Sequence, residues 1–514
     1  MMGEIKMKIN VSPEKRTFID VDSLTQWDTN IYQRFPMADK VPIRGLEPGP
    51  SGTWDSGFTT IWGTVLKEKD LFKMWYWGQP ETPSYDVNPD LPFVCYAESE
   101  DGINWHKPDL KITGQNRYPG NNLLTLPGCC MGVVHGLPGT NSKYLMALIR
   151  YGVGLVPDVT DIPKNKIDDP SGTYIYASDD GLHWNMVTKL FSHGDWACLY
   201  ADKETNRYLL YNKVGAMHGI ISRRSAIVVQ SEDGIHWEGY DGVRKWHECF
   251  VPDDYDDIIA RQQGGLISEY YGVGVYRCGE SLISVEDIFI VWLHLRQCFA
   301  QNPNGLCYFR LGFSHDGIIW RHPHGRPIWL TTGNPSEWDA GFMVPSSTFV
   351  EHNDELFLYY GGSRYDHGWS INPDFSLKKD IPLSDHRDTA RVMMAKIKKD
   401  RFASLASTYK GYFDVDAEKR YGSVLYINCI CRSSDASIRI AIAEKQGPYH
   451  GAIRKSDSLN GFSFDDCVPI TTDSVSAPVR FKNKKISDIP VDLPLSLRVE
   501  LNKSEIFGYE WKNE

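Results

Sequence analysis

The chain has 514 residues, of which 41% are hydrophobic and 24% are charged, a balance typical of globular proteins. Its net charge of −11, and the absence of any Lys/Arg run, exclude nucleic acid as the main partner. Aromatic residues make up 12% of the chain, including 16 Trp and 27 Tyr, which favours an all-β protein or one that stacks on sugar rings. The length suits two domains.

The N-terminus has no apolar signal-peptide core, and no stretch approaches the roughly 18 apolar residues that span a bilayer. Eleven Cys are scattered without metal or disulfide spacing. We interpret them as buried free thiols of a reducing compartment. The sequence therefore predicts a cytoplasmic protein with no membrane partner.

In chain order, residues 1–45 precede the first repeat and are interpreted as an N-terminal extension. The first repeat is "WDSGF" at 54–58, which returns as "WDAGF" at 338–342, 284 residues later. Each copy leads into a similar pair of strand-like segments. If the copies open the first and last units, four intervals of about 71 residues separate them, and five units fill residues 46–400.

A second repeat, Ser-x-Asp-Gly-aliphatic-x-Trp, occurs four times, beginning at Ser99, Ser178, Ser231 and Ser314. Each copy follows a β-rich run, and Asp-Gly between strands indicates a tight turn in which Gly adopts positive φ. The Ser and Asp side chains can cap the backbone N–H groups of the turn. We interpret the motif as architectural: it closes a hairpin in successive units and performs no catalysis.

Residues 401–514 contain short alternating strands split by Gly, Pro, Asn and Asp, such as "GSVLYINCIC" and "ASIRIAIAEK". That pattern is typical of a β-sandwich. No helical periodicity of convincing length occurs anywhere. The predicted fold is all-β: a five-bladed β-propeller at 46–400, followed by a C-terminal β-sandwich.

The hairpin repeat, the "WDSGF" entry and "LFLYYGGSRYDHG" resemble the five-bladed furanosidase-type glycoside hydrolases, the superfamily of families 32, 43, 117 and 130. The appended sandwich is most similar to family 32 architecture. Departures are clear, because the Asn-Asp-Pro-Asn-Gly box of family 32 is missing from the first blade. "QNPNG" at 301–305 lies in another blade and is interpreted as a loop. The resemblance implies a divergent branch whose sugar is unassigned.

The resemblance also implies catalytic carboxylates: an Asp of the first blade as base or nucleophile, a later Glu as acid, and an Asp between them that orients the acid. Asp55, in "GTWDSGF", is the candidate base, with a turn-capping role as the alternative. Asp195, in "SHGDWACLY", is the candidate orienting residue. Glu269, in the apolar strand "ISEYYGVGV", is the candidate acid, since a carboxylate there must be paired, protonated or open to the channel. Glu280 and Glu286 are expected to face solvent.

Seven further residues are candidates for binding substrate. Trp54 and Trp196 follow the pattern of sugar-stacking platforms beside the carboxylates. Asp339 repeats the setting of Asp55 and is expected to bind hydroxyls, act as base or be structural. His367, in "YDHGW", is expected to hydrogen-bond a sugar or to be an ordinary loop residue. Three cations that end second strands are expected either to converge on an anion or to be solvated at the surface: Arg150, Lys213 and Arg296.

The leading hypothesis is a glycosidase that removes terminal, furanosidic sugars from oligosaccharides with a carboxylate pair in the channel. A phosphate-dependent glycoside phosphorylase and a non-catalytic carbohydrate-binding propeller are the alternatives. The sequence indicates no cofactor and no metal ligand set; a structural Ca²⁺ in the channel stays open, although no loop has EF-hand spacing. A homo-oligomer also stays open, because the sandwich could pack on its own propeller or on a neighbour.

Overall fold

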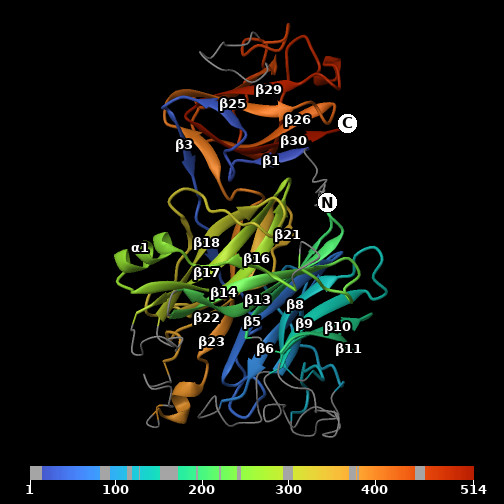
Figure 1. Cartoon of the computed structure of the whole chain (residues 1–514), viewed down its shortest axis with the longest axis vertical. Helices are drawn as coiled ribbons and strands as arrows, with labels where there is room; N and C mark the ends of the chain where they lie inside the picture. The colour runs from blue at the N-terminus through green and yellow to red at the C-terminus, as the bar shows by residue number, and fades with distance from the viewer. Residues whose placement is uncertain are drawn as a thin grey trace, which may run out of the picture.

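The computed structural model describes residues 14–81, 93–112, 118–126, 128–150, 172–192, 195–218, 221–239, 245–292, 305–369, 378, 381–445 and 458–513. Within these residues nearly all regular structure is β (Figure 1), as the sequence predicts. The one α-helix described is α1 (Asp254–Gln262), and two short 3₁₀ turns are η2 (Leu383–His386) and η3 (Ile486–Asp488). No described helix has the length and apolar character that crossing a membrane requires.

Five antiparallel sheets follow one another along residues 58–398, each built mainly from strands that are consecutive in the chain. The first has β5 (Phe58–Glu68), β6 (Leu71–Gln79) and β7 (Phe93–Ser99). The second has β8 (Cys129–His135), β9 (Tyr144–Arg150), β10 (Gly172–Ser178) and β11 (Asn185–Phe191). The third has β12 (Ala197–Asp202), β13 (Arg207–His218), β14 (Ile221–Ser231) and β15 (His247–Phe250).

The fourth sheet has β16 (Ile267–Cys278), β17 (Ser281–Val291), β18 (Gly305–Ser314) and β19 (Ile328–Leu330). The fifth has β20 (Phe342–Pro345), β21 (Val350–His352), β22 (Glu355–Ser363) and β23 (Ala390–Lys398), with β4 (Asp39–Val41) as its outer strand. The first strands touch in cyclic order, β5 to β8, β12, β16, β20 and back to β5. The five sheets therefore close a ring with these strands innermost.

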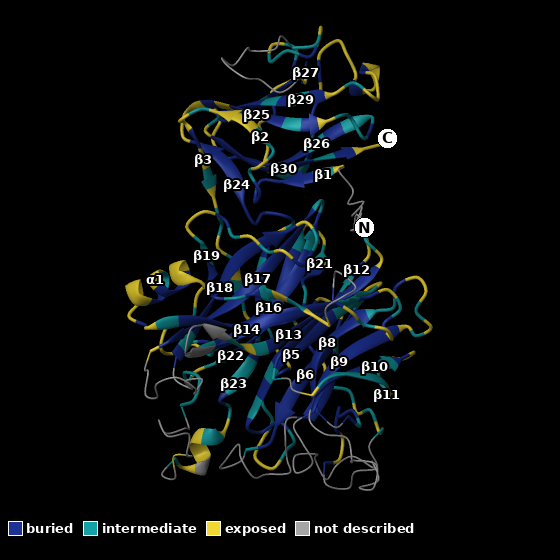
Figure 2. Ribbon diagram, in the orientation of Figure 1, coloured by how far each residue is buried: buried dark blue, intermediate teal, exposed yellow. Residues whose placement is uncertain are grey.

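The remaining strands form two further sheets above the ring (Figure 1). One is ordered β28 (Ser474–Pro478), β26 (Val424–Cys431), β30 (Ser504–Lys512), β24 (Ser404–Ser407) and β3 (Ile31–Arg34), with β1 (Lys15–Thr17) also on β30. The other is ordered β2 (Leu24–Trp27), β25 (Lys410–Glu418), β29 (Leu495–Asn502) and β27 (Ser437–Glu444). Buried residues line the interiors of both parts of the molecule (Figure 2).

The interpretation of residues 1–45 as an extension is wrong for its described part. Lys15 pairs with Glu510, and Phe18 and Ile31 belong to the apolar core of the upper two sheets. Strand β4 instead pairs with β23, Val41 lying opposite Met394, and completes the fifth sheet of the ring. Each of the four strands described in this segment, β1 to β4, thus pairs with a strand from another part of the chain, which covers sheet edges that would otherwise invite pairing with other chains.

The hairpin repeat has the architectural role predicted for it. In the copy after β7, Ser99 Oγ accepts from Gly102 N at 2.9 Å, and the motif Asp accepts from the following N–H groups. The motif glycines all have positive φ, from 73° to 81°. The turn also joins neighbouring sheets: Trp75 of β6 donates to Gly181 O at 2.8 Å, and Tyr359 of β22 donates to Gly102 O at 2.7 Å.

Candidate functional site

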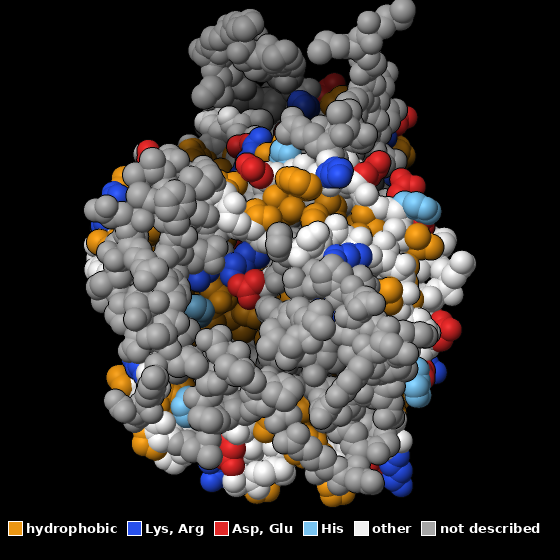
Figure 3. All heavy atoms as spheres, turned by 60° about the horizontal axis from the view of Figure 1, so that its bottom comes forward, with side chains coloured by type: hydrophobic (Ala, Val, Ile, Leu, Met, Phe, Trp, Pro, Cys, Tyr) orange, Lys and Arg blue, Asp and Glu red, His pale blue; other side chains and the backbone are white. Residues whose placement is uncertain are grey.

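One face of the ring carries a hollow in which acidic and basic side chains lie beside hydrophobic ones (Figure 3). This face is turned away from the upper two sheets, and the first strands of the ring begin there. Polar residues that stand just before these strands, or early in them, therefore lie around the axis of the ring. Residues from the third, fourth and fifth sheets form the cluster described next.

Asp195, directly before β12, is ion-paired with Lys213 of β13. The Asp195 side chain is 47% exposed, whereas that of Lys213 is 5% exposed. Burial by surrounding protein atoms raises the pKa of Asp195, but the charge and hydrogen bond of Lys213 outweigh it and hold the pKa below its usual range. Burial lowers the pKa of Lys213, and Asp195 only partly offsets this. The pair thus leaves a negatively charged carboxylate partly open to solvent.

Glu269 of β16 is 2% exposed and is ion-paired with Arg224 of β14. Its second oxygen accepts from the Arg224 backbone N at 3.2 Å. Burial lowers the pKa of Arg224, but the charge of Glu269 dominates and raises it. A carboxylate that accepts from a guanidinium has no proton to give, so Glu269 is not a proton donor in this arrangement.

Tyr271 connects the two ion pairs. Lys213 Nζ lies 4.6 Å from the centroid of the Tyr271 ring, and the Arg224 guanidinium carbon lies 5.2 Å from the same centroid. Both distances are those of cation–π contacts. The Tyr271 hydroxyl is 2.8 Å from His367 Nε2. Trp62 of β5 and Phe342 of β20 complete the surroundings, with ring centroids 6.0 and 5.1 Å from that of Tyr271. The sequence analysis missed Arg224 and Tyr271.

A third carboxyl, Asp287 of β17, lies deeper and was also missed. It is 0% exposed, and neither oxygen has a hydrogen-bond partner that satisfies ordinary geometry. Burial raises its pKa well above the usual value, which the Cys307 thiol and Lys213 only partly offset. Opposite it stands Gly272, where an added Cβ would lie 3.5 Å from the Asp287 Cβ and 3.2 Å from Trp196 Nε1. Asp287 and the buried Trp196 therefore line the base of the site.

The structure places Asp55 elsewhere. Its carboxylate is 1% exposed, accepts from Thr53 Oγ1 at 2.9 Å and is ion-paired with Lys107 at 2.6 Å. Asp339 is its counterpart, 0% exposed and paired with Lys40 at 2.6 Å. The hydrogen bonds and ion pairs of both carboxylates with described residues do not involve the cluster around Tyr271. Both aspartates are instead held by lysines, as partners in buried ion pairs.

The other sequence candidates are divided. His367 joins the cluster through Tyr271, whereas Trp54 packs edge-on against Tyr118, centroids 6.3 Å apart, in the core of the first sheet. Arg150 is buried at the end of β9, with its guanidinium 5.2 Å from the Tyr174 ring. Arg296 lies outside the described residues. The expectation that Glu286 faces solvent is wrong, because it is 0% exposed and ion-paired with Arg310 at 2.8 Å.

Within the described residues no group of three or more His, Cys, Asp or Glu is arranged to hold a metal ion. The cluster instead brings together Asp195 paired with Lys213, Glu269 held by Arg224, and the buried Asp287, whose pKa burial raises. Carboxyl groups in contrasting environments are what acid–base chemistry on a sugar requires.

No protein-family model matches the chain. A search of curated proteins also finds no match. Similar solved structures include an N-acetylgalactosamine deacetylase from F. plautii in complex with blood group B trisaccharide (13% identity, 71% of this chain, 96% of that chain, TM-score 0.46). Another is a thermostable family-43 glycoside hydrolase (14% identity, 69% of this chain, 96% of that chain, TM-score 0.41). A third is a structure of the GH130 family of mannoside phosphorylases and glycoside hydrolases (12% identity, 71% of this chain, 94% of that chain, TM-score 0.43). Similarity at this level assigns no activity.

Proposed function

We propose that the chain is a glycoside hydrolase that cleaves the terminal sugar of a small oligosaccharide in the hollow of the ring. The observation that carries the proposal is the meeting of Asp195 and Glu269, from adjacent sheets, around Tyr271. Two carboxyl groups flanking one bond are the minimum for glycoside hydrolysis. The aromatic rings beside them suit the apolar faces of sugars.

In this proposal Asp195 replaces Asp55 as base or nucleophile, because Lys213 lowers its pKa and its side chain is 47% exposed. Glu269 is the general acid. That role requires the bound sugar to draw Arg224 away from it, so that Glu269 can hold a proton. Asp287 is the alternative acid, protonated by burial but closed off from solvent in the ligand-free chain.

The proposal extends to the architecture and the setting. We propose that the ring is a five-bladed propeller and that the upper two sheets form a β-sandwich, to which β1, β2 and β3 contribute along with the C-terminal strands. We also propose furanosidic substrates, a cytoplasmic location and turnover without a cofactor. The resemblance of the repeats supports the first of these, and the free thiols of the described cysteines support the second.

Phosphorolysis is a second candidate, favoured by the two cations Lys213 and Arg224 beside the carboxylates. A phosphorylase uses inorganic phosphate as the nucleophile, and buried cations would hold that anion. Each cation is paired with a carboxylate in the ligand-free structure, so phosphate would have to displace one of these pairs.

The test is hydrolysis of a panel of nitrophenyl furanosides and pyranosides, with and without phosphate. Wild type is run beside Asp195→Asn, Glu269→Gln, Asp287→Asn and the control Glu232→Gln, which changes an exposed acid of a hairpin turn. We expect phosphate-independent turnover that falls by at least 100-fold in Asp195→Asn and Glu269→Gln and persists in the control. Loss of turnover in Asp287→Asn, with turnover retained in Glu269→Gln, would assign the role of general acid to Asp287 instead of Glu269. Turnover only with phosphate would establish the phosphorylase.

A further inference from the structure

The two copies of the Trp-Asp motif differ in what surrounds the Trp. The aspartates of the two copies make the same contact, because the carboxylate of each is buried and lies 2.6 Å from a Lys Nζ. Trp54, however, packs against Tyr118 within the core of the first sheet. Trp338 lies between two guanidinium groups, those of Arg364 and Arg391, each 3.8 Å from its ring centroid. The buried Asp–Lys pair, which both copies share, is explained by its role in stabilising the fold. The stacking of two arginines on Trp338 is not.

The two arginines are not equivalent. Arg391 is neutralised by Asp388, to which it donates from Nε at 2.8 Å and from a terminal nitrogen at 2.6 Å. Arg364 is exposed and has no ion-pair partner among the residues that the structure describes. A guanidinium that stacks by its face keeps its N–H donors in the ring plane, where they match a carboxylate. Arg364 is therefore held in position by Trp338 with its donors free.

The stack and the cluster around Tyr271 are linked through the fifth sheet. Arg364 directly follows β22 and is three residues from His367, which contacts Tyr271 in the cluster. Phe342, four residues beyond Trp338, also packs against His367, with centroids 5.1 Å apart. Next to Arg364, Tyr365 and Trp369 stack at 4.3 Å and 24°. One cation and a group of aromatic rings thus stand together on the fifth sheet, beside the carboxylate cluster.

We propose that Arg364, stacked on Trp338, binds the carboxylate of a uronic acid residue in the saccharide whose neighbouring sugar occupies the hollow. The inference rests on the proposed function and names its substrate class: acidic oligosaccharides. A bidentate guanidinium–carboxylate contact gives both charge and orientation, and the neighbouring rings supply the apolar surface that a sugar face needs. A neutral sugar would leave the Arg364 donors facing solvent and would gain nothing from the stack.

The test compares binding of uronic acid oligosaccharides with that of their carboxyl-reduced, neutral counterparts, on an array and then by calorimetry. The wild-type chain should favour the acidic member of a pair by at least tenfold, and the preference should weaken above 0.3 M salt. Arg364→Gln should abolish the difference between the members, and Arg364→Lys should restore part of it. Arg321→Gln, which removes an exposed Arg paired with Asp22 on the fourth sheet, is the matched control.

Equal binding of both members by wild type, or an unchanged preference in Arg364→Gln, would overturn the inference. Binding of inorganic phosphate or sulfate through Arg364 as tightly as a uronate would also overturn it, since the site would then recognise a free anion. Because binding is measured without turnover, the two proposals fail separately. An inactive chain that still discriminates through Arg364 would remove only the hydrolase assignment, and turnover of neutral glycosides without discrimination would remove only this inference.

Discussion

Lys213 decides the charge of the most accessible carboxylate in the site. Burial raises the pKa of the Asp195 carboxyl, and the adjacent Lys213 ammonium contributes most, together with Arg224 and His367, to bringing it below the usual range. Burial in turn destabilises the charged form of Lys213 and lowers its pKa. The two side chains thus stabilise each other's charged form, and neither would keep it alone in this environment.

Lys213→Met is expected to raise the pKa of Asp195, since burial then acts without the opposing cation. Because the pKa rises, a smaller fraction of Asp195 is ionised in the variant than in wild type at any pH close to that pKa. ¹³C-carboxyl NMR titration of Asp195 should show a shift of at least one pH unit to higher pH. Lys73→Met, at a lysine paired with Glu68 far from the cluster, is the control. An unchanged titration would show that Lys213 does not set the charge of Asp195.

In the sequence, a carboxylate that interrupts an apolar strand marks a candidate site residue. Glu269 was singled out for that reason, and Asp287, in the equally apolar "SVEDIFIV", would have been found by the same rule applied consistently. Asp55 and Asp339 look alike in sequence because they are alike in structure, yet their partners Lys107 and Lys40 come from segments distant in the sequence. No local pattern encodes such partners. The ion pairs of Asp55 and Asp339 were therefore visible only in the three-dimensional structure.

At the scale of elements, the hairpin repeat could be predicted from the sequence because the residues that stabilise its turn are neighbours in the chain. Ser, Asp and Gly within five residues satisfy the turn, and the structure adds bonds from the preceding sheet, such as Trp75 Nε1 to Gly181 O. The placement of β1 and β3 in the upper sheets was not readable. Lys15 pairs with a residue almost 500 positions later, and strand pairing over such a separation leaves no signal in a single sequence.

Gly181→Ala tests the hairpin as a junction between sheets. Gly181 has φ 81°, and an added Cβ would lie 2.9 Å from Trp75 Cζ2. The left-handed backbone costs about 1–2 kcal/mol, and the overlap with a packed Trp costs about 1–3 kcal/mol more. Urea denaturation should therefore show a loss of roughly 2–5 kcal/mol. Gly120→Ala, at φ 70° with no atom within 4 Å, should lose only the backbone contribution. Equal losses in both variants would refute the packing role.

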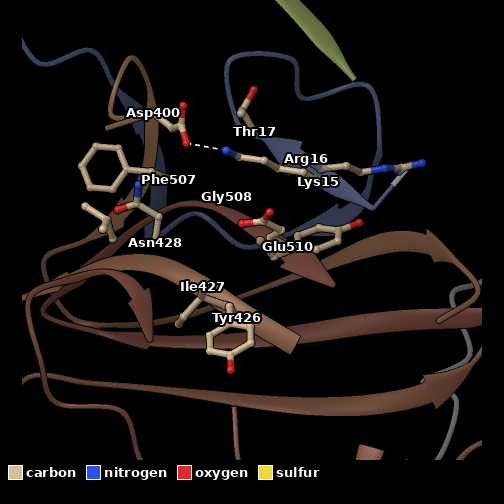
Figure 4. A pocket seen from close by; sticks show the side chains of 12 residues that line it. Lys15, Arg16, Thr17, Asp400, Tyr426, Ile427, Asn428, Phe507, Gly508 and Glu510 are labelled. Atoms are coloured by element: carbon tan, nitrogen blue, oxygen red, sulfur yellow. Dashed lines mark hydrogen bonds and ion pairs between the residues drawn. The ribbon is translucent and has the colours of Figure 1, made fainter. Parts of the chain in front are cut away.

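At the scale of the whole molecule, the ring and the upper sheets meet through a small polar junction. Lys15 of β1 is ion-paired with Asp400 at 2.5 Å (Figure 4), beside a cavity of about 30 Å³ lined by β1, β26 and β30. Asp400 also accepts from Tyr276 of β16 at 3.1 Å, and Glu280 N donates to Lys15 O at 3.1 Å. The N-terminal segment, which serves both parts, thus links their unfolding.

Lys15→Met should weaken that link. Asp400, whose side chain is only 9% exposed, would lose its cation, at a cost of roughly 1–3 kcal/mol. Calorimetry should then resolve two transitions where wild type shows one, because the ring and the upper sheets each keep their own apolar core. Lys512→Met, which breaks an exposed pair with Glu510 inside the upper sheets, should leave a single transition. One unchanged transition in Lys15→Met would mean that the remaining contacts, such as the Arg16–Glu280 ion pair at 3.3 Å, suffice to couple the two parts.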